Sequence, residues 1–136
     1  MTIVVDASVA VKWVLRESDS DAADALLDHH DLMAPVLWLA EAANALWCRA
    51  RIGEITADEA DQRISELLNA PVASPAIERH LGPALRLATE IGHPVYDCLY
   101  LALALHHDTH VVTADRRFAA AAARPDLADR VRLLGT

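Results

Sequence analysis

Two carboxylates follow short β-branched runs. Asp6 comes directly after residues 2–5, and Asp115 comes two residues after residues 110–113. Neither run alternates polar with apolar residues, which is typical of strands buried on both faces of a parallel sheet. Because ligands of such sheets bind beyond the carboxyl ends of the strands, we expect Asp6 and Asp115 at one edge.

Two further carboxylates stand in apolar helical stretches. Glu41 lies inside residues 38–47, and Asn44 shares its helical face at position i+3. Asp97 opens residues 96–105, which are otherwise almost entirely apolar. A carboxylate among Ala and Leu on both sides is expected to be partly buried, and an unpaired buried carboxylate costs several kcal/mol.

A divalent cation is the natural partner for these four groups. The chain has one lysine, Lys12, and its arginines fall outside these segments. Clustered carboxylates repel one another, whereas a hard cation with oxygen ligands relieves both repulsion and burial.

Each carboxylate also has an ordinary structural explanation. Asp6 and Asp97 are both suited to capping a helix N-terminus. Asp115 fits a turn, and Glu41 fits an ion pair with an arginine from elsewhere in the chain. Taken together, these explanations require four acidic residues to gather by accident.

Composition limits the class of protein. The chain has 136 residues, 54% hydrophobic and 24% charged, and a formal net charge of −8. These values fit one domain over residues 1–136 and exclude a disordered chain. With no apolar stretch long enough for a bilayer and no leader pattern, we expect a soluble, cytoplasmic protein without membrane contact. The acidic balance alone argues against a general nucleic-acid-coating protein.

The elements that must position the carboxylates alternate along the chain. Expected strands cover residues 2–5, 32–34, 72–74, 110–113 and 131–134. Expected helices begin at a Ser8 cap and at a Thr56/Glu59 capping box, and cover 20–29, 37–51, 81–91, 96–106 and 116–123. Strands separated by helices predict right-handed crossovers, and hence an α/β/α sandwich with a mostly parallel sheet.

The order of these residues resembles a known family. The chain is similar to the PIN-domain ribonucleases, and within them to the VapC toxins of bacterial toxin–antitoxin pairs. The resemblance spans residues 3–134 and is carried by four motifs: Val-Val-Asp6-Ala-Ser8, Glu41-x-x-Asn44, Tyr96-Asp97-x-x-Tyr100 and Thr113-Ala-Asp115-x-x-Phe118.

The resemblance implies a fold, a site and partners. It implies a five-stranded sheet of order 3-2-1-4-5 and a catalytic Mg²⁺ or Mn²⁺ site that activates water against RNA. It further implies homodimerisation and a VapB-type antitoxin in a hetero-oligomer. By family pattern the acidic metal ligands are Asp6, Glu41, Asp97 and Asp115, with polar support from Ser8, Asn44 and Thr113.

Because the chain is acidic overall, basic side chains near the motifs would have to contact the RNA. Arg49, Arg51, Arg116 and Arg117 are nearest in sequence to the motifs, and arginine suits bidentate phosphate recognition. For each of them, solvation or pairing with a surface carboxylate is the competing explanation.

Two other classes of protein with acidic sites fit this sequence less well. A receiver-like module needs paired carboxylates after the first strand and a late lysine, and an Asp-x-Asp phosphatase needs an acid where Ser8 stands. A catalytically silent RNA-binding or regulatory PIN-like module stays open as the alternative.

The remaining chemical side chains favour structural roles. Cys48 and Cys98 are expected to be buried, reduced thiols. The His29-His30 and His106-His107 pairs stand at expected helix C-termini, which favours dipole interactions over zinc binding.

Apolar residues are abundant near the Glu41-x-x-Asn44 motif. Trp13, Trp38 and Trp47 are expected in the core or an interface rather than stacked on bases. Residues 9–15 and 37–51 together predict an apolar groove for an antitoxin helix.

Overall fold

The structure is a computed structural model that describes residues 1–136 throughout. Its five strands are β1 (Thr2–Val5), β2 (Asp31–Met33), β3 (Val72–Ala73), β4 (Val111–Thr113) and β5 (Val131–Leu133). Its helices are α1 (Ala7–Ala10), the 3-10 helix η1 (Val11–Trp13), α2 (Ser20–His29), α3 (Trp38–Arg51), α4 (Ala57–Leu68), α5 (Glu78–Ile91), α6 (Val95–His106) and α7 (Arg116–Ala121).

The strands form one parallel sheet of order β3-β2-β1-β4-β5, which confirms the expected topology. Ile3 of β1 lies opposite Leu32 of β2, and Val5 lies opposite Val112 of β4. The chain moves outward from β1 in one direction and later returns to the other side of β1. The strand order therefore reverses between β1 and β4, where sheets of this type bind ligands.

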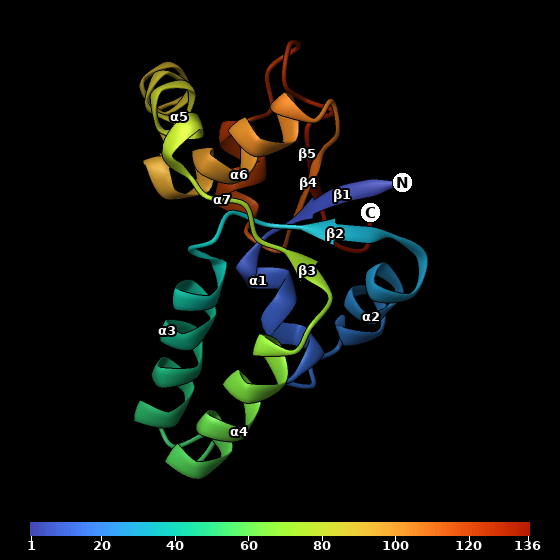
Figure 1. Ribbon diagram of the computed structural model, residues 1–136, viewed down its shortest axis with the longest axis vertical. Helices are drawn as coiled ribbons and strands as arrows, with labels where there is room; N and C mark the ends of the chain where they lie inside the picture. Colours follow the sequence, from blue (N-terminus) through green and yellow to red (C-terminus); the bar gives the residue numbers. More distant parts are fainter.

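Helices cover both faces of the sheet. In Figure 1, α5, α6 and α7 lie above the sheet, and α1, α2, α3 and α4 lie below it. Helices α3 and α4 pack on each other and extend away from the sheet. The three-layer α/β/α sandwich expected from the sequence is confirmed.

The core explains why β1 and α6 lack polar alternation. Ile3, Val4 and Val5 are fully buried because helices cover both sides of β1. Every residue from Cys98 to Ala104 is buried too, so α6 is a central helix that is apolar all round. None of the helices is both long enough and apolar enough to cross a membrane.

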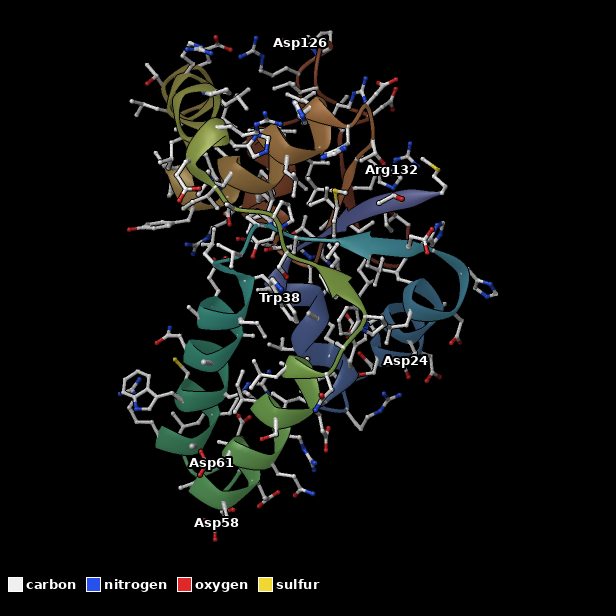
Figure 2. The ribbon with its side chains drawn as sticks, in the orientation of Figure 1. Asp24, Trp38, Asp58, Asp61, Asp126 and Arg132 are labelled. Atoms are coloured by element: carbon white, nitrogen blue, oxygen red, sulfur yellow. The ribbon has the colours of Figure 1, made fainter.

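The start of α3 is tied to the sheet. Figure 2 shows Trp38 directed from α3 toward the middle of the molecule. Trp38 is buried, and its indole N–H donates to the Ser74 hydroxyl just after β3 at 2.8 Å. This contact fixes the first turn of α3, which carries Glu41.

Two expected helix starts are wrong. Ser8 does not cap a helix, because α1 already begins at Ala7 and the Ser8 hydroxyl donates to Asp6 instead. The helix expected from residue 81 begins at Glu78 and continues through Pro83. By contrast, the capping box of α4 is present as predicted.

Some burial expectations also fail. Cys98 is buried, but Cys48 is only half-buried; both are free thiols. Trp47 is 56% exposed on α3, so it is not a core residue, and the expected alternative of an interface stays a prediction. Val9 and Leu15 are buried in the core, so residues 9–15 do not line an open groove.

Candidate active site

Asp6 is the buried centre of the site. It follows β1 and is 4% exposed. The hydroxyls of Ser8 and Thr113 both donate to its Oδ2 atom, each at 2.7 Å. Burial raises the pKa of the Asp6 carboxyl, the two hydroxyls lower it, and the charge of Asp97 raises it again. No lysine or arginine side chain pairs with this buried acid.

The same two hydroxyls tie Asp6 to the segment after β4. The Ala114 backbone N–H donates to the Ser8 hydroxyl at 3.0 Å, and the Asp115 N–H donates to Thr113 Oγ1 at 3.0 Å. Asp115 caps α7, since its Oδ1 accepts the Arg117 N–H at 2.9 Å. The Thr113 hydroxyl thus links Asp6 to the backbone of Asp115, and the Ser8 hydroxyl links Asp6 to the preceding residue, Ala114.

Glu41 reaches the same place from α3. Its Oε1 accepts a hydrogen bond of 2.6 Å from the hydroxyl of Tyr100, and it has no arginine partner. Burial raises the pKa of Glu41 to about 7; the Tyr100 bond lowers it, and the Asp6 and Asp97 charges raise it. Burial also raises the pKa of Tyr100, so this fully buried hydroxyl stays protonated and donates.

Asp97 completes the set from the first turn of α6. It is not the cap, because α6 begins at Val95 with Pro94 at the capping position. Its Oδ2 lies 2.6 Å from His93 Nε2, an i, i+4 pair in which the ring nitrogen is the donor to the carboxylate. The His93 ring is stacked on Phe118, with centroids 5.4 Å apart and planes at 14°. The imidazole is therefore held between α7 and Asp97.

Sequence reasoning missed the donors His93 and Tyr100. Tyr100 belongs to a motif that was recognised but was given no function, and His93 lies in the loop before α6. The available signal was spacing: His93 stands four residues before Asp97 and Tyr100 three residues after it. These positions share one helical face with Asp97.

The four carboxylates share one hydrogen-bonding pattern. Each has one oxygen that accepts a bond from a donor of the chain, whereas the other oxygen accepts no side-chain bond. The bonded oxygens are Asp6 Oδ2, Glu41 Oε1, Asp97 Oδ2 and Asp115 Oδ1. Orientation is thereby fixed while one oxygen of each group stays available.

These carboxylates line one hollow of about 230 Å³, here called the acidic hollow. Its walls are Asp6, Ala7, Ser8, Glu41, Ala45, Asp97 and Asp115. Asn44 lies elsewhere: it lines a larger neighbouring cleft of about 630 Å³ between α3 and the start of α6. The structure thus gathers the four acids but separates Asn44 from the hollow.

The acidic hollow has the chemistry of a hard-cation site. Its ligands are oxygen atoms, and the burial of Asp6 and Glu41 without a cation is a cost that a divalent ion would relieve. No three Asp, Glu, His or Cys side chains converge closely enough to hold one ion directly. One or two direct carboxylate ligands with water bridges to the others fit this arrangement, which is how proteins commonly hold Mg²⁺.

The candidate RNA-contacting arginines divide into two pairs. Arg116 and Arg117 are exposed, make no ion pair and directly follow Asp115. Arg49 instead pairs with Glu17 and Glu54, and the Arg51 guanidinium lies 5.2 Å from the Trp47 ring centre. Both are two to three helical turns along α3 from Glu41.

Comparison with known sequences gives one family. The family profile of the PIN domain matches residues 3–124 of this chain. Ribonuclease VapC3 of Pyrobaculum aerophilum is 35% identical over 125 residues, which cover 88% of this chain and 93% of that protein.

Solved structures share the fold. PAE2754 from Pyrobaculum aerophilum has a TM-score of 0.71 at 28% identity, over 89% of this chain and 79% of that chain. VapC20 of Mycobacterium tuberculosis, described as a sarcin-ricin loop cleaving toxin, has a TM-score of 0.66 at 18% identity. The match covers 88% of this chain and 94% of that chain. VapBC2 from Rickettsia felis, bound to a DNA fragment from its promoter, has a TM-score of 0.63 at 13% identity, and the match covers 98% of both chains.

Proposed function

This chain belongs to the PIN-domain family, on its VapC-type ribonuclease branch, and from that premise we propose a metal-dependent endoribonuclease that is the toxin of a toxin–antitoxin pair. One observation carries the catalytic part. Four carboxylates from separate segments line one hollow, and each keeps one oxygen free of side-chain bonds. Buried carboxylates that have no lysine or arginine partner cost stability, and strongly shifted acids gathered in one hollow are typical of catalytic sites.

The metal ligands would be drawn from Asp6, Asp97, Asp115 and Glu41, directly or through water. A bound Mg²⁺ or Mn²⁺ supplies a water of lowered pKa and neutralises charge on the phosphate. Ser8 and Thr113 hold Asp6 in place during this chemistry, and His93 holds Asp97. Glu41, whose Oε1 is held by Tyr100 while its other oxygen accepts no side-chain bond, is suited to orient the attacking water or accept its proton.

Arg116 and Arg117 would contact the RNA backbone beside the acidic hollow. Their exposure, their freedom from ion pairs and their place after Asp115 support this assignment. Replacing both with glutamine should lower the slope of log affinity against log salt by about 1 to 2. An unchanged slope would remove them from the RNA footprint.

An antitoxin would bind the apolar surface of the α3–α4 pair. A groove of about 270 Å³ lies there, with seven of eight lining residues hydrophobic, among them Leu46, Trp47 and Ile64. A helix with apolar residues at i, i+4 spacing fits such a groove. A second copy of this chain would pack on α5, where Leu81 and Leu85 are exposed on one face.

A cleavage assay on labelled RNA tests the proposal. The wild-type chain should cleave with Mg²⁺ or Mn²⁺, leave 5′-phosphate and 3′-hydroxyl ends, stop in excess EDTA and resume when metal is restored. The cytoplasm, where RNA is abundant, is the expected site of action. Undiminished cleavage in EDTA would reject metal dependence. RNA binding without cleavage under any metal would favour the silent RNA-binding module.

A further inference from the structure

The larger cleft is continuous with the acidic hollow. It has a volume of about 630 Å³ and shares three lining residues with the hollow: Glu41, Ala45 and Asp97. Any group that fills the cleft therefore lies directly against the carboxylates. If RNA is cleaved at the hollow, the nucleotide next to the cleaved phosphate is the part of the substrate within reach of the cleft.

Tyr96 forms one wall of the cleft and is 67% exposed. It is the second residue of α6 and the direct neighbour of Asp97, so its backbone is fixed by a rigid helix. Its hydroxyl makes no hydrogen bond with the rest of the chain. A large, exposed aromatic ring on a helix beside the acidic hollow offers a stacking surface for a base.

Asn44 lies on the α3 wall of the same cleft, one helical turn from Glu41. It is exposed, and its amide makes no hydrogen bond within the chain. A free amide offers two donor hydrogens and one acceptor oxygen, which match the polar edge of a base. Ala40 and Ala45 keep the remaining α3 wall small and apolar.

The charge of the cleft indicates whether a base or a phosphate of the RNA would bind in it. Its only charged residues are Glu41 and Asp97, both acidic. The cleft thus offers a phosphate no lysine or arginine as partner, whereas a neutral base with apolar faces and a polar edge needs none. The half-apolar lining, the free aromatic ring and the free amide together match that chemistry.

We propose that the cleft between α3 and α6 is a nucleobase subsite, in which an RNA base next to the cleaved phosphate stacks on Tyr96 and meets Asn44. This inference rests on the proposed function. The subsite gives the protein a means to prefer particular bases, because Tyr96 stacks with any base while Asn44 distinguishes their edges.

Fluorescent RNA tests the subsite without requiring cleavage. Short RNAs carry one 2-aminopurine, moved one position at a time, and are bound to the wild-type chain with Ca²⁺ in place of Mg²⁺. Stacking on Tyr96 should quench fluorescence at one position. Tyr96→Phe should keep the affinity, because its ring offers the same face for stacking, and Tyr96→Ala should lose the quenching and bind about tenfold to hundredfold more weakly. Asn44→Ala should reduce the differences in affinity among bases at that position.

Leu105→Ala is the matched control, because Leu105 is an exposed apolar residue at the opposite end of α6 and lies outside the cleft. It should leave quenching unchanged. Equal affinity and equal quenching in Tyr96→Ala would overturn the subsite. A shift in oligomeric state or antitoxin binding in Tyr96→Ala, with quenching unchanged, would assign the cleft to a protein partner and overturn it too.

The two proposals fail separately. Cleavage of RNA by the wild-type chain with Mg²⁺ tests the nuclease, and Tyr96-dependent quenching tests the subsite. Cleavage with quenching that does not depend on Tyr96 rejects only the subsite. Tyr96-dependent quenching without cleavage supports the subsite and rejects the nuclease.

Discussion

Two acidic regions of this protein differ in the partners that surround their carboxylates. In the acidic hollow, neutral hydroxyls, one imidazole and one backbone N–H hold the four acids. In a second region, here called the Lys12 network, each acid has a cation. Its members are Lys12, Glu17, Asp19, Arg49 and Glu54, with Lys12 Nζ at 2.7 Å from Glu17 and 3.0 Å from Asp19.

The pKa values follow this difference. The Lys12 hydrogen bond, followed by that of Arg49, lowers the pKa of Glu17. Burial raises the pKa of Glu41 to about 7. Glu17 therefore stabilises the fold at neutral pH, whereas the ionised forms of Asp6 and Glu41 cost stability there. Other acids, such as Asp58 near the start of α4, point into solvent and belong to neither region (Figure 2).

Replacing Asp6 should separate activity from stability most strongly. Asp6→Asn keeps an oxygen for the Ser8 and Thr113 hydroxyls but removes a buried charge. We expect RNA cleavage to fall about a thousandfold or more, since a metal site contributes several kcal/mol to catalysis. The melting temperature should stay level or rise. Cleavage assays and thermal melts check both, and full activity would contradict the assignment of the hollow.

Glu17→Gln is the converse change in the Lys12 network. It leaves Lys12, whose side chain is 11% exposed, with Asp19 as its only acidic partner. The free energy of unfolding should fall by about 2 kcal/mol, because one partner of a partly buried pair is lost. RNA cleavage below the melting temperature should not change. A loss of cleavage without a loss of stability would break the contrast between the regions.

Removing a hydrogen-bond donor from the hollow should weaken metal binding while the carboxylates remain. Tyr100→Phe deletes the hydroxyl that orients Glu41, and His93→Phe deletes the donor to Asp97 but keeps a ring against Phe118. Each should lower Mn²⁺ affinity about tenfold, the usual effect of losing a group that orients a ligand. Titration calorimetry measures this directly.

The control for these donors is His106→Phe, at the opposite end of α6. His106 lies among other histidines and Arg79 and contacts no carboxylate of the hollow. Its Mn²⁺ affinity should equal that of the wild type. Unchanged affinity in both Tyr100→Phe and His93→Phe would mean that the donors serve only packing.

The sequence predicted the hollow better than it predicted the Lys12 network. Asp6 and Asp115 follow strands, and parallel topology alone brings strand ends together. Glu41 was evident as an acid in an apolar helix. The ion pairs of the Lys12 network were less evident from the sequence. Arg49 and Glu17 are 32 residues apart, and no local spacing links them. Ser8 was misassigned as a cap because the residue type fits both a helix start and a bond to Asp6.

The smallest expected effect is on the pH dependence of stability. The pKa of Glu41 is about 7 in the folded state, against 4.5 for an ordinary glutamate. Between these values the folded protein binds more protons than the unfolded chain, so metal-free stability should fall as pH rises through this window. Glu41→Gln should remove about 1 kcal/mol of that loss, allowing for water screening at this half-buried group.

Glu17 should titrate with the opposite sign. Its pKa is lowered in the folded state, so its contribution is complete above the ordinary value of 4.5 and is lost as pH falls below it. Glu17→Gln should therefore change the pH profile only on the acid side, whereas Glu41→Gln changes it between about pH 4.5 and 7. Denaturant unfolding in EDTA at stepped pH values measures both, and identical profiles for the two variants would mean that the two regions do not differ in electrostatics.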